Sequence, residues 1–326
     1  MTARARTLFM GSGSFALPVL DVVHAHPRSE LVAVVTAPAR PVGRTQQLRD
    51  TPVAGRAAEI GAPVMTPDRL RDPGVHQELT ALAPDLIVLA DYGRIVPSTL
   101  LEMPRHGPLN VHPSLLPRHR GASPIAATIL AGDDESGVTI LHMDAGVDTG
   151  PIVAQRRVAV PERATAPDLE ALLAAAGAEL LGDTLGPWLD GAIEPVAQST
   201  SGVSLTRPLR RDDGRLDASR SAELLERQVR AYRPWPGSWL DTVAGRVTVL
   251  RAMAVPASAL GSGPGNIPGV FVDAGALDGT PALTTSDGLL LLLEVLPAGG
   301  RAMEGAEWLR GRPGVIGSRV TAGTLG

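Results

Sequence analysis

The sequence predicts an α/β fold, in which a parallel sheet in the first part of the chain is followed by a small β-barrel. Short apolar runs alternate with amphipathic stretches from Leu8 onward, a pattern typical of βαβ units. Two neighbouring apolar runs after Gly137 are joined by a short acidic, glycine-flanked segment, which predicts a hairpin. Beyond Thr206, short β-rich runs are separated by Gly, Pro and Asp, as in small barrels.

The predicted elements of the first part follow in order along the chain. Apolar runs predict strands at residues 8–10, 31–36, 86–90 and 109–111, and paired strands at residues 137–143 and 152–160. Amphipathic periods predict helices at residues 15–23, 53–60 and 124–130, and a long helix after Thr165 that reaches residue 185.

The second part begins with one predicted helix at residues 221–232. Strands are predicted at residues 247–250, 270–272, 283–285 and 289–295, and the Gly-, Ser- and Pro-rich stretch 256–269 is expected to be a mobile loop. These patterns divide the chain into a first domain of residues 1–189, a linker of residues 190–206, a second domain of residues 207–318 and a tail of residues 319–326.

Composition excludes several kinds of chemistry. The chain contains no cysteine, and all 30 of its Lys+Arg residues are arginine, so thiolate nucleophiles, cysteine-held metals and catalytic lysines are excluded. No apolar run suits a signal peptide or a membrane span, so a cytoplasmic protein is expected. Residues 1–206 contain 16 Arg and 22 Asp/Glu, whereas residues 207–326 contain 14 Arg and 12 Asp/Glu. The more basic second part could contact phosphates, or could simply present a solvated helix face.

A glycine-rich turn follows the first predicted strand. Gly11, Gly13 and Ala16 match the Gly-x-Gly-x-x-Gly/Ala spacing of dinucleotide-binding turns, but the next strand ends without the acidic residue that binds the ribose of NAD. Arg40 keeps an NADP oxidoreductase open, because an arginine can bind a 2′-phosphate. The favoured interpretation is that the glycines only permit a tight turn between strand and helix.

Two polar side chains, in the strand predicted at residues 109–111 and directly after it, form the main candidate site. Asn110 and His112 lie two positions apart, so they project from the same face, at the sheet edge where α/β folds bind ligands. An amide beside an imidazole suits a carbonyl oxygen that becomes negative, which indicates acyl transfer. The acidic loop 143–150 contains Asp144 and Asp148, and a carboxylate of this loop could hold the tautomer of His112 and favour its protonated form, although an ordinary Asp-Gly turn would give the same sequence. No metal site is predicted.

These motifs, taken together, resemble the folate-dependent formyltransferases. The resemblance extends over nearly the whole chain, and the Pro-Trp-Pro-Gly motif with the basic second domain favours the members of the family that act on methionyl-tRNA. The motifs that carry it are Asn110-Val111-His112-Pro113-Ser114-Leu115-Leu116-Pro117-Arg118 with Gly121, Gly137-Val138-Thr139-Ile140, Asp148-Thr149-Gly150, Arg40-Pro41-Val42-Gly43-Arg44 and Arg233-Pro234-Trp235-Pro236-Gly237.

The resemblance implies an enzyme that transfers formyl from the co-substrate 10-formyltetrahydrofolate to the α-amine of methionine on initiator tRNA, for translation initiation, without a metal. It implies a doubly wound, mostly parallel, Rossmann-like catalytic domain, an OB-like tRNA-binding domain and a monomeric protein. The site residues it implies are Asn110, His112 and Asp148 for catalysis, Ser114, Leu115, Leu116 and Pro117 for binding folate, and Arg40, Arg44, Arg210, Arg230 and Arg233 for binding tRNA.

The chain departs from the family pattern in one region that matters for the acceptor. After Arg44 it reads Thr45-Gln46-Gln47, where the family usually carries a run of basic residues. Fewer cations weaken contact with phosphates. A divergent formyltransferase that acts on a small amine or an amino sugar is therefore the alternative.

Overall fold

The computed structural model describes residues 4–42, 46–256, 267–273 and 279–321. Contacts between Cα atoms divide the chain into two compact units. Unit 1 contains residues 1–124, 134–161 and 168–207, and unit 2 contains residues 125–133, 162–167 and 208–326. No helix in the described ranges combines the length and apolar character that crossing a membrane requires.

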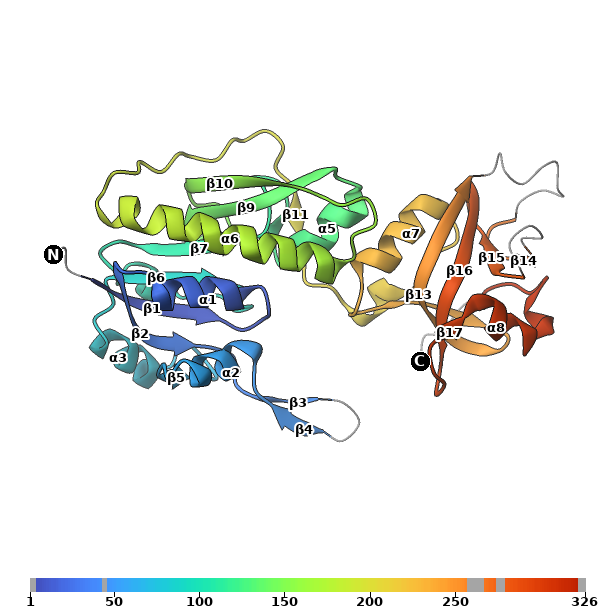
Figure 1. Cartoon of the computed structure of the whole chain (residues 1–326), viewed down its shortest axis with the longest axis horizontal. Coiled ribbons are helices and arrows are strands. Elements are labelled where there is room, and N and C mark those ends of the chain that lie inside the picture. The colour runs from blue at the N-terminus through green and yellow to red at the C-terminus, as the bar shows by residue number, and fades with distance from the viewer. Residues whose placement is uncertain (1–3, 43–45, 257–266, 274–278, 322–326) are drawn as a thin grey trace. The chain divides into compact units, whose positions relative to one another are not determined.

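Unit 1 is built on a seven-stranded sheet with the order β10-β9-β7-β6-β1-β2-β5 (Figure 1). The pairs among β5, β2, β1, β6 and β7 are parallel, whereas β9 is antiparallel to both β7 and β10. The predicted doubly wound, mostly parallel sheet is therefore confirmed. Its strands are β1 (Ala5–Gly11), β2 (Ser29–Val35), β5 (Val64–Met65), β6 (Leu86–Ala90), β7 (Pro108–His112), β9 (Glu135–His142) and β10 (Ile152–Ala159).

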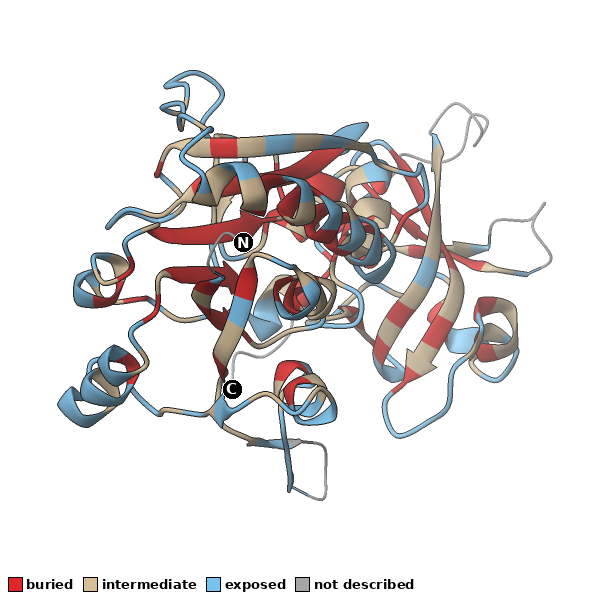
Figure 2. Ribbon diagram, turned by 60° about the vertical axis from the view of Figure 1, so that its left-hand side comes forward, coloured by how far each residue is buried: buried red, intermediate tan, exposed pale blue. Residues whose placement is uncertain are grey.

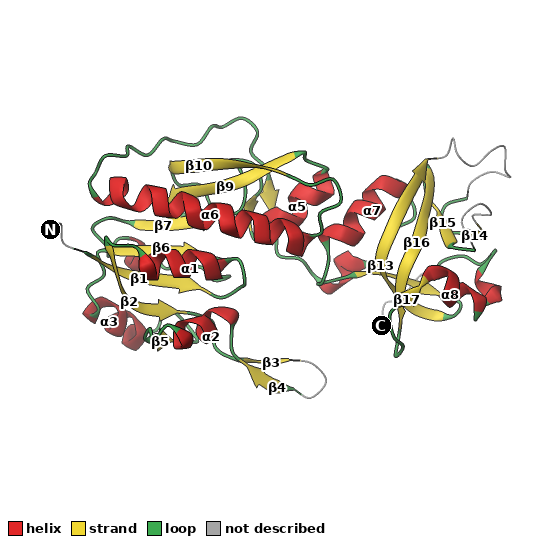
Figure 3. Ribbon diagram, viewed as in Figure 1, coloured by secondary structure: helices red, strands yellow, loops and turns green. Residues whose placement is uncertain are grey.

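Helices cover both faces of this sheet, as the secondary structure in Figure 3 shows. Helix α1 packs on β1, β2 and β6. Gly177 lets α6 approach closely, because a Cβ atom there would lie 3.0 Å from Val111 of β7. The helices of unit 1 are α1 (Ala16–Ala25), α2 (Pro52–Glu59), α3 (Pro73–Ala81), α4 (Ser98–Leu101) and α6 (Ala166–Leu189).

The core of the sheet follows from the alternation of its side chains. All five residues of β6 are buried, as a central strand covered on both faces requires. Leu8 and Met10 of β1 join Ile87 and Leu89 of β6 in one apolar cluster, with Leu79 of α3. Figure 2 shows this buried band along the strands. The strands are thereby held rigidly, and their carboxyl ends form a defined edge.

Unit 2 is built on a curled antiparallel sheet with the order β12-β13-β16-β15-β14, and β17 pairs with β16. The register between β13 and β16 shifts on both sides of Arg251, which interrupts the regular pairing of the two strands there. Helix α7 packs on β13 and β16, and buries Leu225 and Val229 in the core of the unit. The predicted OB-like barrel is confirmed as a curled half-barrel. Its elements are α5 (Pro124–Ala131), α7 (Ala222–Ala231), β12 (Ser238–Thr242), β13 (Gly245–Pro256), β14 (Phe271–Asp273), β15 (Pro281–Thr284), β16 (Gly288–Pro297), β17 (Met303–Glu304) and α8 (Gly305–Arg310), with the short 3-10 helices η1 (Arg211–Gly214) and η3 (Pro313–Val315).

Several short elements were not predicted from the sequence. The strands of the hairpin β3 (Arg40–Val42) and β4 (Gln47–Arg49) are only three residues long, too short to show a periodic pattern in the sequence. Residues 190–206, for which the sequence predicts a linker, belong to unit 1, where β11 (Leu205–Thr206) pairs with β8 (Arg120–Gly121). Hydrogen bonds between the backbones of Val196 and Ile152, and of Ser204 and Arg120, fix this segment. The composition of the segment gives no sign of these bonds. Most of the loop expected at 256–269, and residues 322–326 of the expected tail, lie outside the described residues.

Candidate active site

Asn110 and His112 lie at the carboxyl end of β7, where the chain leaves the sheet. Val111 between them faces α6, so the two polar side chains project from the opposite face. Both residues are buried: Asn110 is 7% exposed and His112 is 4% exposed. Buried polar groups need partners, and the loop between β9 and β10 supplies them.

Asp148 of that loop joins the two side chains into one cluster. Its Oδ1 accepts a hydrogen bond from Asn110 Nδ2 at 3.0 Å, and its Oδ2 lies 3.5 Å from His112 Nδ1. The backbone N–H of Gly121 also donates to Oδ2, at 2.9 Å. Asp148 has a φ of +52°, a left-handed conformation that costs energy for a side chain other than glycine. The structure thus brings the three sequence-predicted residues together, with the acid held in a strained turn.

The environment of His112 favours its neutral form. Burial lowers the pKa of the imidazole, and this effect outweighs the charge of Asp148 and the hydrogen bond to the carbonyl of His119, which both raise it. Asp148 does favour the protonated ring, as expected, because its charge raises this pKa, but burial has the larger effect. His112 Nε2 lies 3.1 Å from the His119 carbonyl, which can only accept, so Nε2 carries the proton of the neutral ring. Nδ1 is then the free base, facing Asp148.

The loop that follows β7 is held by hydrogen bonds inside the protein. Thr139 of β9 donates to the carbonyl of Ser114 at 2.7 Å and accepts from the backbone N–H of Leu116 at 3.1 Å. Ser114 is 1% exposed and Leu116 is 4% exposed. Leu115 and Pro117 are half-buried, so they are the members of the predicted folate loop that retain exposed surface.

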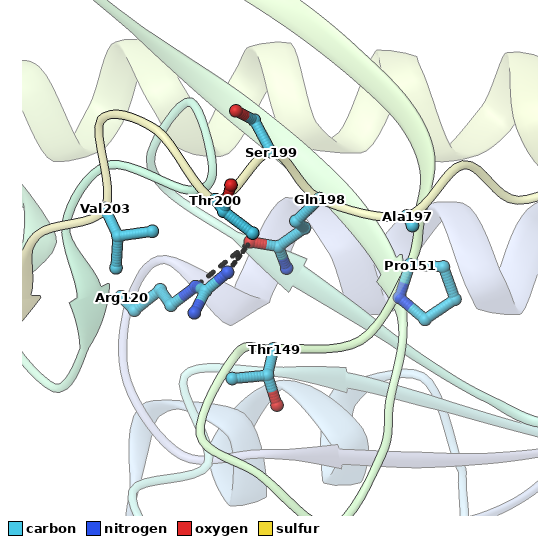
Figure 4. Close-up of a pocket in the computed structure, with 8 residues that line it drawn as sticks. All are labelled: Arg120, Thr149, Pro151, Ala197, Gln198, Ser199, Thr200 and Val203. Carbon is cyan, nitrogen blue, oxygen red and sulfur yellow. Dashed lines mark hydrogen bonds between the residues drawn. The ribbon is translucent and has the colours of Figure 1, made fainter.

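A pocket of about 530 Å³ lies next to the cluster in unit 1 (Figure 4). Arg120 and Thr149, the neighbours in sequence of Gly121 and Asp148, form part of its wall. The remaining lining comes from the segment predicted as a linker and from the end of the β9–β10 loop: Pro151, Ala197, Gln198, Ser199, Thr200 and Val203. Sequence reasoning missed this segment because it lacks any recognisable motif.

Two domain matches decide the family. Residues 4–185 match the formyl transferase domain, and residues 208–313 match the formyl transferase C-terminal domain. The chain belongs to the formyl transferase family. It is 44% identical over 313 residues to a methionyl-tRNA formyltransferase of Roseiflexus sp. (strain RS-1), covering 94% of this chain and 92% of the relative. It is 40% identical over 322 residues to a methionyl-tRNA formyltransferase of Myxococcus xanthus, covering 97% and 98%.

A solved structure shows the same fold in this family. The N-formyltransferase of Helicobacter canadensis, in complex with folinic acid and dTDP-3-aminofucose, superimposes with a TM-score of 0.64 at 17% identity. The alignment covers 89% of this chain and 98% of that one. At this identity the likeness describes the fold.

In this formyl transferase the glycine-rich turn is explained by close packing. A Cβ atom on Gly11 would lie 2.8 Å from the carbonyl oxygen of Ala90, and one on Gly13 would lie 1.7 Å from Oδ2 of Asp91. The turn therefore sits directly against the end of β6. This is the structural interpretation that the sequence favoured over dinucleotide binding.

Ionisation of the Asp91 carboxyl group is expected to lower the stability of the protein as the pH rises toward 6. Residue 91 is exposed, but its carboxylate lies against Gly13, and loss of solvent with the nearby charge of Glu170 raises its pKa to about 6. A folded-state pKa above the unfolded value of about 4 means that the folded protein binds more protons between pH 4 and pH 6, so stability falls as the pH rises through that window. Asp91→Asn should therefore raise the thermal midpoint at pH 8 more than at pH 4. Glu78→Gln, on an exposed position of α3, is the control, and an equal gain at both pH values would contradict the prediction.

Removing the hydroxyl of Tyr92 is expected to make the folded protein more stable. The side chain is 2% exposed in an apolar cluster, and within the described residues its hydroxyl has no hydrogen-bond partner. A buried unpaired hydroxyl costs about 1–3 kcal/mol. Tyr92→Phe should increase the free energy of unfolding by about 1 kcal/mol in urea denaturation. A decrease would show that the hydroxyl has a partner in solution.

The five arginines predicted to bind tRNA are in different situations. Arg40, Arg210 and Arg233 are exposed, and Arg44 lies outside the described residues. Arg230 is instead occupied within unit 2: it forms a bidentate ion pair with Glu226 at 2.7 and 2.9 Å and donates to the carbonyl of Ala164. These contacts fasten α7 to residue 164, and binding of tRNA by Arg230 stays a prediction.

Proposed function

We propose that this chain transfers the formyl group of 10-formyltetrahydrofolate to the α-amine of methionine on initiator tRNA. The observation that carries the proposal is the meeting of Asn110, His112 and Asp148 at the carboxyl edge of the sheet, in a chain that aligns over nearly its whole length with methionyl-tRNA formyltransferases. Such an enzyme would act in the cytoplasm, and we expect it to be a monomer.

The cluster supplies what the reaction needs. The amine attacks the formyl carbon, a C–N bond forms, and the carbonyl oxygen becomes negative. Asn110 has a second amide N–H besides the one given to Asp148, and it can donate to that oxygen. The neutral His112 can take the amine proton at Nδ1, where Asp148 would stabilise the imidazolium. Collapse of the tetrahedral centre then breaks the bond to N10, and the proton passes to the tetrahydrofolate that leaves.

A ligand oxygen could also compete for the other imidazole nitrogen. His112 Nε2–H donates to the His119 carbonyl. The oxyanion would receive this donor only by displacing that carbonyl. Among the residues of the predicted folate loop, Leu115 and Pro117 keep exposed surface that an apolar part of the folate could contact.

The arginines suit a polyanionic acceptor. Arg40 faces Arg49 directly across the β3–β4 hairpin, and like charges in this register destabilise a strand pair unless an anion lies between them. Arg210 and Arg233 add exposed cations on unit 2. Phosphates of tRNA would neutralise these charges, so binding should weaken steeply with salt.

One assay tests the proposal. The protein is incubated with 10-formyltetrahydrofolate labelled in the formyl group, and with methionyl-tRNA, free methionine or a nucleotide-linked amino sugar as acceptor. We expect transfer to methionyl-tRNA alone, with KM rising as salt is increased. Transfer to the amino sugar or another small amine instead would establish the alternative suggested by the missing basic residues after Arg44.

A further inference from the structure

Gln198 connects the segment 190–206 to the loop that carries Asp148. Its Nε2 donates to the carbonyl oxygens of Asp148 at 2.8 Å and Gly150 at 2.7 Å. Its Oε1 accepts from both Nε and Nη2 of Arg120, at 3.0 and 2.8 Å, as Figure 4 shows. Both amide hydrogens and both lone pairs of Gln198 are therefore used, and its orientation is fixed.

The same region also holds the carboxylate of Asp148. Gly121 follows Arg120 on β8 and donates its N–H to Oδ2. Strand β8 is in turn paired with β11, which ends the segment that carries Gln198. A side chain at position 121 is excluded, since a Cβ atom there would lie 2.3 Å from the carbonyl of Thr206. Gln198 thus holds the main chain of Asp148, and Gly121 of β8 holds its carboxylate.

The hydrogen bonds from Gln198 and Gly121 matter for the site because Asp148 adopts a left-handed backbone conformation. Such a conformation persists only when surrounding contacts enforce it. The two carbonyls bonded by Gln198 lie on either side of Thr149, directly after the strained residue. Without these bonds the turn is free to relax, and the carboxylate would move away from Asn110 and His112.

We propose that Gln198, oriented by Arg120, is a positioning residue that holds Asp148 against His112 and Asn110. The proposal rests on the proposed function only where formylation is the readout. The competing explanation is that Gln198 merely fastens residues 190–206 to unit 1. A fastening role predicts lower stability with an unchanged site, whereas a positioning role predicts a changed site.

The variant that tests this is Gln198→Met, which keeps the length of the side chain and adds no charge but removes all four hydrogen bonds. Ser201→Ala is the matched control, since Ser201 is exposed in the same segment and is not one of the residues that line the pocket. We expect kcat for formylation to fall about 10- to 100-fold in Gln198→Met, because small misplacements of a catalytic group have effects of this size. KM for both substrates should stay unchanged, and Ser201→Ala should behave like the natural protein.

A second readout does not depend on catalysis. The titratable side chains that act on the pKa of His112 in the structure are those of Asp148 and His119. If Asp148 moves away, its stabilisation of the imidazolium is weakened, so the pKa of His112, followed by NMR of labelled histidine, should fall in Gln198→Met. Arg120→Met should lower kcat as well, and the double variant should be no slower than Gln198→Met, because both residues act on the same turn.

The outcomes separate the two proposals. If the natural protein formylates no acceptor, the proposed function fails, but the titration of His112 still tests the position of Asp148. If Gln198→Met titrates like the natural protein and keeps its kcat, the positioning role is overturned. It is also overturned if kcat falls only in step with the thermal midpoint while the titration of His112 is unchanged.

Discussion

Replacing His112 with alanine is expected to lower kcat for formyl transfer by about two to three orders of magnitude, within the usual range for removing a side chain that takes a proton in the transition state. The imidazole is buried beside Asp148 and carries its only free base at Nδ1. Alanine removes both this base and the Nε2 donor, while the strand that carries them stays in the sheet. Steady-state kinetics with labelled formyl donor measure the effect.

A surface histidine provides the control for this experiment. His24→Ala, at an exposed position in the last turn of α1, removes the same atoms away from the cluster and should leave kcat unchanged. The thermal midpoint of His112→Ala should be measured alongside, so that a folded protein is compared. A folded His112→Ala variant that keeps most of its rate would exclude His112 from the chemistry.

Strand periodicity explains why part of the site could be predicted from the sequence. Asn110 and His112 share a face because side chains alternate along β7, and the fully buried β6 beside it marks the carboxyl edge of a parallel sheet. The β9–β10 pair follows from two apolar runs around one turn. These patterns involve residues that are close together in the chain, so they can be recognised in a single sequence.

The rest of the site depends on contacts between distant parts of the chain. Gln198 is 50 positions from Asp148, and a single glutamine between Ala and Ser gives no signal of its hydrogen bonds. The protonation of His112 depends on how completely β7 is covered, which sets the cost of a charge there. Arg230 looks like a free cation in the sequence, and only the fold shows its partner Glu226 and the Ala164 carbonyl.

Asp148→Asn is expected to have a comparably large effect, for a reason that its hydrogen bonds make definite. Both carboxylate oxygens accept, Oδ1 from Asn110 and Oδ2 from Gly121. An amide has only one accepting atom, so in either orientation its NH₂ group must face a donor. Asparagine tolerates the left-handed backbone conformation better than most residues, so the turn itself should survive. We expect kcat to fall by about two orders of magnitude or more, since the imidazolium that forms when His112 takes the amine proton is no longer stabilised by a carboxylate.

The pH dependence distinguishes this loss of charge from a general disturbance. Asp148 raises the pKa of His112, partly offsetting burial, so its neutralisation should lower that pKa further. Because the neutral ring is the proposed base, the residual kcat/KM should fall at a lower pH than in the natural protein. Asp144→Asn is the matched control: Asp144 uses one oxygen, Oδ1, to accept from Gly146 and Thr149, and an asparagine can keep both bonds. An acid limb that stays in place in Asp148→Asn, or that moves equally in Asp144→Asn, would mean that the charge of Asp148 does not control the imidazole.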